Sequence, residues 1–282
     1  MVDIVLRLTY NCNLKCAHCC YECEPGRESM SLQTLESVLE NIEGPLVTTI
    51  LLGGGEPFTR PRLLKQAIAS IAERREDGCY PNLESVSVQT NGLWAKNPSV
   101  TARYLTELNA LGLDYIVFTG NDQFHREEAK RRRLIAPEPA FNLLCQTNTE
   151  LRLQNKRRHR LRMDYKSESH LMPDPIGRAR NLPTAMLALT SECEMDNSSL
   201  TVSTDGSLYP CGFLRPFSLG SLVLEPLSRI MEQMKRPHDE PWLIATLKKR
   251  GLYQACDAEI LATNPCIICE RVFSTNDETR SR

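Results

Sequence analysis

Five cysteines stand close together near the start of the chain, in the segment NCNLKCAHCCYEC at residues 11–23. Three of them, Cys12, Cys16 and Cys19, have the spacing CxxxCxxC directly after a short β-rich run. Three thiolates on one short loop can hold three irons of a 4Fe-4S cluster and leave the fourth iron without a protein ligand. A zinc ion bound by the same thiolates and the imidazole of His18 is the competing interpretation.

The twelve cysteines of this 282-residue chain are too sparse for a small disulfide scaffold. The first residues show no secretion signal, and no segment approaches the ~18 apolar residues that cross a bilayer. We therefore expect a cytoplasmic protein with reduced thiols and no membrane partner. A formal net charge of -1 gives no field that would attract nucleic acid, so none is expected.

The segment LLGGGEPF follows an apolar run and contains Gly54, Gly55, Glu56 and Pro57. Glycines there permit a close backbone approach to a ligand, and the carboxylate and exposed carbonyls can accept hydrogen bonds from an ammonium group. An ordinary glycine turn carrying a surface glutamate is the alternative.

A third segment of this kind, Gln89, Thr90 and Asn91, follows the next β-rich run. These side chains can contact a ligand at the end of a strand, although an asparagine there can also simply cap a turn.

The elements that must position these segments alternate along the chain. We expect strands at 3–9, 46–52, 84–89, 113–118 and 158–165, and helices at 31–43 with Ser31 as N-cap, 61–75, 99–111 and 139–146. Repeated β-α units predict an α/β fold with parallel strands covered by helices. The loops that leave the carboxyl ends of such strands gather on one face, where the three segments above would meet.

The rhythm changes after Pro183. Short strands at 200–203 and 207–209 flank Asp205-Gly206, a hairpin signal, and helices are expected at 225–234 and 241–250. A second set of cysteines lies in this part of the chain and can close a complete metal site from separated segments, with a structural zinc ion as the alternative; it comprises Cys193, Cys211, Cys266 and Cys269.

The first cysteine segment resembles the signature loop of the radical S-adenosylmethionine (SAM) enzymes, with His18 at the position that is usually aromatic. The GGEP segment, residues 89–92, the run TGNDQFH at 119–125 and PIGRA at 175–179 also resemble segments of that family, although Gly120 stands where a serine is usual. The resemblance implies a partial (β/α)6 TIM-like barrel and SAM on the open iron. It also implies cofactor binding by His18 and by the segments at 54–57 and 89–91, and a flavodoxin or ferredoxin-type reductant.

The C-terminal cysteines resemble the Twitch form of the SPASM extension, a small α+β domain that ligates one auxiliary 4Fe-4S cluster. We therefore expect a radical SAM barrel at 1–185 and an auxiliary domain at 186–282. Of the other cysteines, Cys20 and Cys23 are interpreted as neighbours of the first cluster, and Cys79 and Cys145 as small buried hydrophobic residues.

Radical SAM chemistry implies a 5'-deoxyadenosyl radical that removes hydrogen from an unactivated carbon of a bound substrate. Cys256, ten residues before the final CxxC, is a candidate hydrogen donor, which favours epimerisation of a small natural product such as a sugar or aminoglycoside. Dehydrogenation through the auxiliary cluster and modification of a short ribosomal peptide are the alternatives; because the first strand begins at Asp3, no N-terminal peptide-recognition domain is expected. A non-catalytic metal-binding protein is the remaining alternative.

Overall fold

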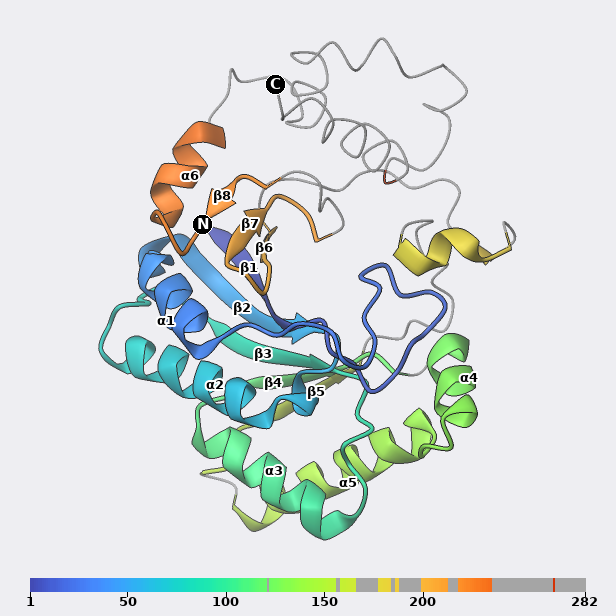
Figure 1. The fold of residues 1–282 in the computed structure, drawn as a ribbon. Coiled ribbons are helices and arrows are strands. Elements are labelled where there is room, and N and C mark those ends of the chain that lie inside the picture. Colours follow the sequence, from blue (N-terminus) through green and yellow to red (C-terminus); the bar gives the residue numbers. More distant parts are fainter. Residues whose placement is uncertain are drawn as a thin grey trace.

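The computed structural model describes residues 1–120, 122–155, 158–165, 177–183, 186–187, 199–212, 218–234 and 266. It shows one eight-stranded sheet with helices packed along one of its faces (Figure 1). The strands are β1 (Val2–Thr9), β2 (Val47–Gly54), β3 (Ser85–Thr90), β4 (Tyr115–Phe118), β5 (Arg162–Tyr165), β6 (Ser199–Val202), β7 (Ser207–Tyr209) and β8 (Gly220–Ser221). The helices are α1 (Leu32–Asn41), α2 (Pro61–Glu76), α3 (Pro98–Ala110), α4 (Gln123–Arg131), α5 (Pro137–Gln154) and α6 (Leu227–Met234).

The strand order is β5-β4-β3-β2-β1-β6-β7-β8, and every neighbouring pair from β5 to β6 is parallel. A helix follows each of β1 to β4, so all four strands point their carboxyl ends toward the same edge of the sheet. The predicted α/β class with parallel strands and covering helices is therefore confirmed. At that edge lie the three segments that the sequence singles out.

The helices begin where side chains or prolines satisfy their first turns. Ser31, Asn97 and Asp122 each accept a hydrogen bond from a backbone N–H three residues later, at 2.9, 3.0 and 2.8 Å. Helices α2 and α5 have no side-chain cap but carry a proline in the first turn. Helix α3 has both the Asn97 cap and a proline. The N-cap role predicted for Ser31 is confirmed.

The two faces of the parallel strands differ sharply. Ile4, Leu6 and Leu8 alternate along β1 and are all 0% exposed, because they pack on the helices in one continuous apolar core. On the other face the burial is uneven: Val5 of β1 and Leu51 of β2 are only half-buried, whereas Arg7 near the end of β1 is buried. We call this second face the inner face of the sheet.

The hairpin predicted around Asp205-Gly206 is confirmed by β6 and β7. Gly206 has φ +84°, a left-handed conformation that glycine adopts without strain, and Asp205 Oδ1 accepts from Ser207 N at 3.0 Å. Strand β6 pairs in parallel with β1, so the hairpin extends the same sheet. The domain boundary at 185/186 stays a prediction, because much of the chain on its C-terminal side lies outside the described residues.

Several local expectations change. Helix α4 was not predicted because the sequence QFHREEAKR lacks an apolar stripe, and α5 is longer than the expected 139–146. Cys79 is exposed and Cys145 is half-buried, so neither is the buried apolar residue that was expected. Both lie away from the core, Cys79 in the turn after α2 and Cys145 on an outer side of α5. The helix expected at 241–250 lies outside the described residues.

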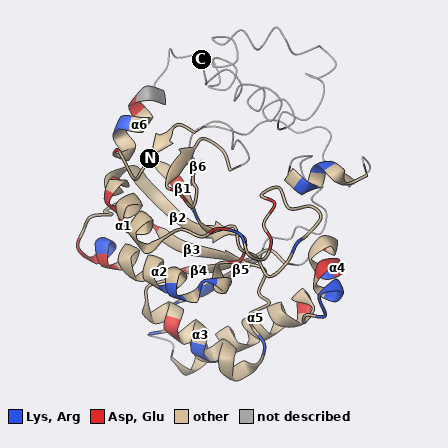
Figure 2. Ribbon diagram, in the orientation of Figure 1, with Lys and Arg blue, Asp and Glu red and all other residues tan. Residues whose placement is uncertain are grey.

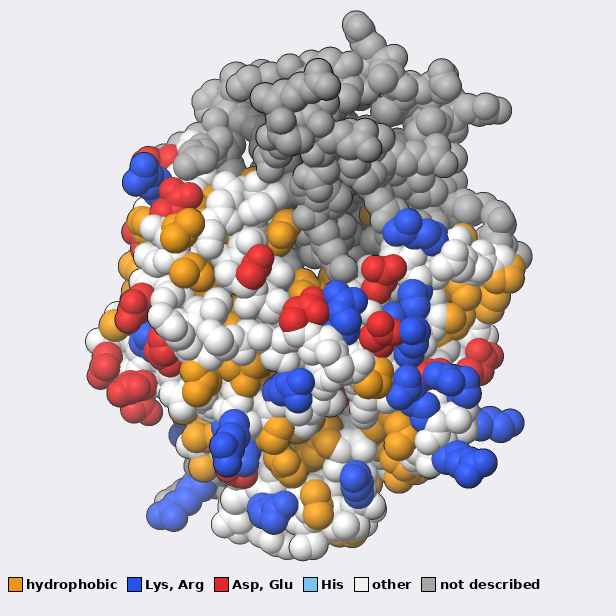
Figure 3. Space-filling model, in the orientation of Figure 1, with side chains coloured by type: hydrophobic (Ala, Val, Ile, Leu, Met, Phe, Trp, Pro, Cys, Tyr) orange, Lys and Arg blue, Asp and Glu red, His pale blue; other side chains and the backbone are white. Residues whose placement is uncertain are grey.

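Charge is concentrated on the helices and loops. Strands β1 to β4 carry two charged residues, Asp3 and Arg7, and Figure 2 shows their ribbons mostly in the colour of uncharged residues. On the face seen in Figure 3, basic and acidic side chains are interspersed, in keeping with the net charge of -1. Among the described helices, none has both the length and the apolar character needed to cross a membrane.

Candidate metal and cofactor site

The cysteine loop, defined here as residues 10–30, connects β1 to α1 and is folded back onto the end of β1. Glu24 pairs with both ends of the segment from Tyr10 to Cys12: its N donates to the Tyr10 carbonyl at 3.3 Å, and its carbonyl accepts from Cys12 N at 3.1 Å. Met30 N donates to the Leu8 carbonyl at 2.8 Å and closes the loop. Backbone hydrogen bonds therefore fix the conformation of the loop that carries the thiols.

The thiols of Cys12, Cys16 and Cys19 lie close enough to influence one another's protonation. Burial, with smaller contributions from the charges of Glu56 and Cys19, raises the pKa of Cys12 to about 12. Burial, followed by the charges of Cys12 and Asp122, raises the pKa of Cys16 well above its usual value. Buried thiolates this close together require a compensating cation, which a bound metal provides.

Cys19 differs from the other two because a neighbour stabilises its thiolate. The Cys23 thiol donates to Cys19 and lowers its pKa to about 6, and the same contact raises the pKa of Cys23. The Cys23 backbone N–H also donates to Cys19 Sγ at 3.4 Å, as Leu14 N does to Cys12 Sγ at 3.4 Å. Cys23 therefore supports a candidate ligand, as expected for a neighbour of the cluster.

Arg178 holds the cysteine loop from the other side. Its Nε donates to the Cys16 carbonyl at 3.0 Å, its Nη2 donates to the Cys23 carbonyl, and its backbone N donates to the Cys19 carbonyl at 3.2 Å. Gly177 before it has φ +55°, and a Cβ there would stand 2.3 Å from the Cys20 carbonyl oxygen. Gly177 and Arg178 thus pack directly against the backbone that carries the thiols.

The glycine segment at the end of β2 also packs against the cysteine loop. A Cβ on Gly54 would stand 2.0 Å from the Thr9 carbonyl oxygen, and one on Gly55 would stand 2.4 Å from that of Asn11. Gly55 N donates to Thr9 O at 2.6 Å, and Glu56 N donates to Asn11 O at 3.0 Å. In this structure the two glycines permit close contact between two loops, a role that the sequence alone did not indicate.

Glu56 is buried, with 1% of its surface exposed, and the surface glutamate considered as an alternative is wrong. Its carboxylate accepts from Phe58 N at 3.1 Å, from Asn91 N at 2.8 Å and from Thr90 Oγ1 at 2.9 and 3.0 Å. Burial raises the pKa of Glu56 to about 7, although these donors act in the opposite direction. The carboxylate thus ties the end of β2 to the end of β3, with Pro57 beginning the next turn.

The residues after β3 complete this network. Thr90 Oγ1 accepts a hydrogen bond from Trp94 Nε1 at 3.1 Å. Asn91 Nδ2 donates to Asn13 Oδ1 at 2.8 Å, and the same nitrogen lies 4.0 Å from Cys12 Sγ. Asn91 therefore touches the cysteine loop directly. Gln89 lies on the inner face and makes no hydrogen bond to another described residue.

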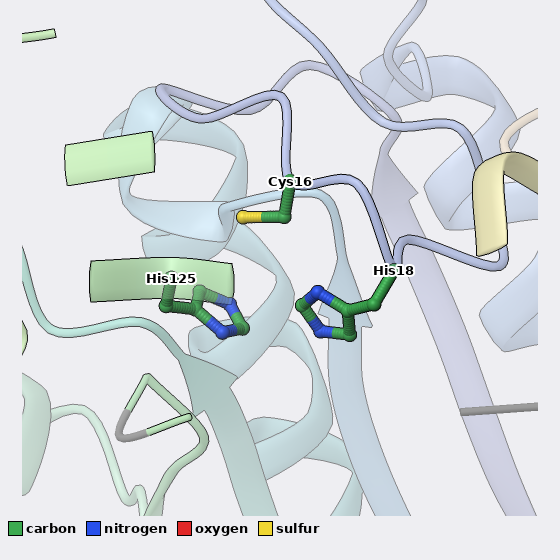
Figure 4. A group of neighbouring side chains, drawn as sticks. All are labelled: Cys16, His18 and His125. Carbon is green, nitrogen blue, oxygen red and sulfur yellow. The ribbon is translucent and has the colours of Figure 1, made fainter. Parts of the chain in front are cut away.

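His18 lies between the cysteine loop and α4. Its ring stacks on Phe124, with centroids 4.8 Å apart, and its Nε2 lies 3.7 Å from Asp122 Oδ2. Burial lowers the pKa of His18 to about 4, and its buried Nδ1 has no hydrogen-bond partner among the described residues. Donor atoms of Cys16, His18 and His125 lie within 4.8 Å of one another, an arrangement that can hold a metal ion (Figure 4).

Sequence analysis singled out the run at 119–125, which contains Asp122 and His125, but it did not predict helix α4 or the contact of Glu128 with the cysteine loop. Asp122 caps this helix and accepts from His125 Nδ1, while Glu128 Oε1 accepts from Lys15 N at 3.0 Å in the cysteine loop. Burial would raise the pKa of Asp122, but the bond and charge of His125 lower it to about 2. The sequence signal that could have located the start of this helix is Asp122, because aspartate is a preferred N-cap residue.

The second cysteine set is described only in part. Cys211 follows β7 and is half-buried, as is Cys266. Cys193, Cys269 and the candidate hydrogen donor Cys256 lie outside the described residues. The auxiliary cluster therefore stays a prediction.

Comparison with known proteins identifies the region that holds this site. Residues 6–133 match the model of the Radical SAM superfamily. A GTP 3',8-cyclase of Synechococcus sp. (strain CC9605) is 35% identical over 119 residues, which cover 40% of this chain and 32% of that relative. The match thus spans about a third of the relative's length.

Two solved structures match most of the length of the chain at low sequence identity. Native anSMEcpe with bound AdoMet is 16% identical, with a TM-score of 0.48 over 82% of this chain and 81% of that one. Streptococcus suis SuiB bound to precursor peptide SuiA is 12% identical, with a TM-score of 0.41 over 86% of this chain and 65% of that one.

A radical SAM domain implies a 4Fe-4S cluster and SAM, and the donor set fits this group. Cys12, Cys16 and Cys19 offer three soft sulfur ligands on one loop, and N–H groups donate to two of the sulfurs. The unpartnered His18 Nδ1 is a further polar atom that a bound group can satisfy. A single metal ion on Cys16, His18 and His125 would leave Cys12 and Cys19 without a role.

Proposed function

We propose that this chain is a radical SAM enzyme in which Cys12, Cys16 and Cys19 hold a 4Fe-4S cluster. The proposal rests above all on the three thiols of one loop, which Arg178 and the segment from Gly54 to Glu56 hold from two sides. When bound, the cluster supplies the electron that cleaves SAM to methionine and a 5'-deoxyadenosyl radical. The domain match at 6–133 covers the loop and the glycine segment.

The residues around the loop have roles that the geometry supports. Backbone N–H groups of Leu14 and Cys23 donate to the sulfurs of Cys12 and Cys19, which favours the thiolate forms that ligate iron. Asn91 and Glu56 keep the ends of β2 and β3 in register with the loop. We assign the SAM contacts to the backbone of residues 54–57 and to His18, Gln89, Thr90 and Asn91, as the family resemblance suggests.

The thiols give a sharp test, because the same loop offers a control. Reconstituted without oxygen, the wild-type chain should bind about four irons and four sulfides at this site and form 5'-deoxyadenosine from SAM with dithionite. Cys16→Ala should abolish 5'-deoxyadenosine formation, whereas Cys20→Ala, one position beyond the motif, should retain it. Iron content without acid-labile sulfide, or one zinc ion per chain at this site, would contradict the proposal.

For the reaction that follows, we propose hydrogen abstraction from a small natural-product substrate and epimerisation with Cys256 as the hydrogen donor. The thiyl radical left on Cys256 would return to the thiol by taking one electron from the flavodoxin or ferredoxin-type reductant and one proton from water. Its support is the position of Cys256 in the sequence, between the barrel and the final CxxC. The alternatives are dehydrogenation with an auxiliary cluster on Cys193, Cys211, Cys266 and Cys269 as electron acceptor, and modification of a peptide.

Cys256→Ala separates these outcomes once a substrate is in hand. An epimerase that loses its hydrogen donor should still form 5'-deoxyadenosine but fail to release the epimer, and the wild-type product should carry one solvent deuterium. Unchanged turnover and product in the variant would exclude the donor role, and a ketone product would assign dehydrogenation. Acceptance of a short peptide in place of sugars would assign peptide modification.

A further inference from the structure

Arg7 is a charged residue in an unexpected place. It lies on the inner face of β1, two residues before the strand ends, and only 6% of its surface is exposed. Among the described residues it has neither an ion-pair nor a hydrogen-bond partner, and its buried Nε is unsatisfied. An unpaired buried cation costs several kcal/mol, so a chain that keeps one leaves it available for an anion.

The strand position beside the guanidinium is a glycine, where a carbon-sized group would meet its neighbours at ordinary contact distance. Arg7 pairs in register with Gly53 of β2, and a Cβ added to Gly53 would stand 3.7 Å from Arg7 Nη1 and 3.7 Å from Gln89 Oε1. Gly212 borders the guanidinium from the segment after β7, with a Cβ position 3.3 Å from Nη2. The Tyr21 ring of the cysteine loop covers it, with the centroid 3.7 Å from Arg7 Cζ.

Two polar side chains without described partners therefore flank a position that has no side chain. The Gln89 amide, like Arg7, makes no hydrogen bond to a described residue. The Gln89 atom nearest the Gly53 position is Oε1, an acceptor, so the N–H donors at this position come from the Arg7 guanidinium. The row formed by Arg7, Gly53 and Gln89 lies one to two residues before the strand ends that hold the cysteine loop.

We propose that Arg7 binds a carboxylate of the substrate over Gly53. This inference rests on the proposed function and adds the chemical class of the substrate, an acid, to it. A planar guanidinium matches the two oxygens of a carboxylate. Inorganic phosphate and phosphate esters fit less well, because no second cation stands in the described part of this row to balance a second charge.

The direct test measures small anions on the full reconstituted chain with SAM, without reduction. Acetate binding is followed by saturation-transfer NMR and compared with acetamide, which has the same shape and no charge. We expect acetate to bind at least about tenfold more tightly than acetamide, and Arg7→Gln to weaken acetate binding by about tenfold or more. Gly53→Val, which fills the space and leaves Arg7 in place, should also remove acetate binding.

Arg162→Gln is the matched control. Arg162 lies on β5 of the same sheet and stacks on Tyr115, as Arg7 stacks on Tyr21, but it is exposed. Its loss should leave acetate binding within about twofold of the wild type. Arg7→Lys keeps the charge without the planar fork and should bind acetate more weakly than the wild type but better than Arg7→Gln.

Three results of the binding experiments would overturn the proposal. They are no saturable acetate binding to the wild type, equal binding by the wild type and Arg7→Gln, and binding of inorganic phosphate about tenfold more tightly than acetate. A thermal midpoint that falls steeply in Arg7→Met would show that Arg7 pairs with a carboxylate of the chain, and would equally overturn it. Because a buried unpaired charge is removed, we expect that midpoint to stay or rise.

The two proposals fail separately. Formation of 5'-deoxyadenosine from SAM with dithionite and without substrate depends on the first cluster and not on substrate binding. The Arg7→Gln variant should therefore still form 5'-deoxyadenosine. A wild-type chain that binds acetate through Arg7 but does not cleave SAM would refute the proposed function and keep the carboxylate site. A chain that cleaves SAM but ignores acetate would do the reverse.

Discussion

The two faces of the sheet are stabilised in different ways, although they belong to the same strands. On the helix-covered face, Leu6, Leu52 and Val88 are each 0% exposed and pack into one apolar core. The inner face presents Arg7 and Gln89, without described partners, over the glycine at 53. One face therefore supplies stability, while the other keeps polar groups and space that add little to stability.

The edge of the sheet at the carboxyl ends of the strands is stabilised in a third way. There the chain is fixed by close backbone contacts and by hydrogen bonds to one buried carboxylate, Glu56, and to one arginine, Arg178. Polar contacts of this kind position atoms more exactly than apolar packing does, but each tolerates little change. The comparison teaches that substitutions should have different consequences on each face and at the edge.

The largest effect is expected at the edge, from Gly54→Ala. Gly54 has φ +132°, which side chains rarely adopt, and a Cβ would stand 2.0 Å from the Thr9 carbonyl oxygen. Strain and overlap together should cost about 3 kcal/mol or more of the free energy of unfolding, measured by urea titration. Gly78→Ala is the control: its φ is +75° but nothing lies within 4 Å of the added Cβ, so roughly 1 kcal/mol is expected. Equal losses would show that the contact at Gly54 is not rigid.

Leu51 and Leu52 compare the two faces directly, because they are adjacent and of the same type. Leu52→Ala removes a side chain that is 0% exposed and should lower the free energy of unfolding by about 2–5 kcal/mol. Leu51→Ala, on the half-buried inner face, should cost roughly 1 kcal/mol. Urea titrations of both variants measure the difference. If Leu51→Ala proves as costly as Leu52→Ala, the inner face is a packed core and the comparison fails.

Glu56 predicts how stability depends on pH. Because burial raises its folded pKa from 4.5 to about 7, the folded state binds a proton that the unfolded state has already released. The contribution of Glu56 is therefore most favourable below pH 4.5 and is lost as the pH rises toward about 7, by roughly 3 kcal/mol at most.

Glu56→Gln should remove this part of the pH dependence, whereas Glu40→Gln, at an exposed position of α1, should leave it unchanged. The measurement is the free energy of unfolding of the apo chain at several pH values from 4.5 to 8. A wild-type profile with the opposite slope, still present in Glu40→Gln and absent in Glu56→Gln, would show that the hydrogen-bond donors outweigh burial.

The smallest effect is expected on the helix-covered side, at His159. Burial lowers its pKa, and its ring nitrogen Nε2 donates to Asn148 Oδ1 at 2.8 Å when the ring is neutral. The unfolded state therefore takes up a proton first as the pH falls below the ordinary histidine value of about 6.5, which destabilises the fold. His159→Gln should flatten this decline between pH 7 and 5.5 in urea titrations; an unchanged decline would assign it to other groups.

Much of the architecture followed from patterns along the chain. The alternation of apolar runs and helical stripes placed five parallel strands and most helices within a few residues, and Asp205-Gly206 located the hairpin. Helix α4 escaped because its helical character comes from the Asp122 cap and from Glu128 pairing with Arg131 and Arg132, and no apolar periodicity marks it.

For the site, residue types and short spacings indicated the metal loop, the glycine segment and the segment after β3. Their mutual contacts did not follow, because Arg178 lies more than 150 residues from the cysteines whose carbonyls it binds. Glu56 looked equally suited to a surface turn, and only the packing of β2 beside β3 shows that it is enclosed.

The amino-acid sequence by itself determined the local chemistry: which thiols share a loop, which turns need glycine, and where strands and helices alternate. These depend on near neighbours and on backbone preferences that act within a few residues. Only the tertiary structure decided that Glu56 is buried, that Arg178 binds the cysteine loop, and that Arg7 is enclosed with no ion-pair or hydrogen-bond partner among the described residues. Burial and pairing arise where distant segments meet, so no local pattern carries them.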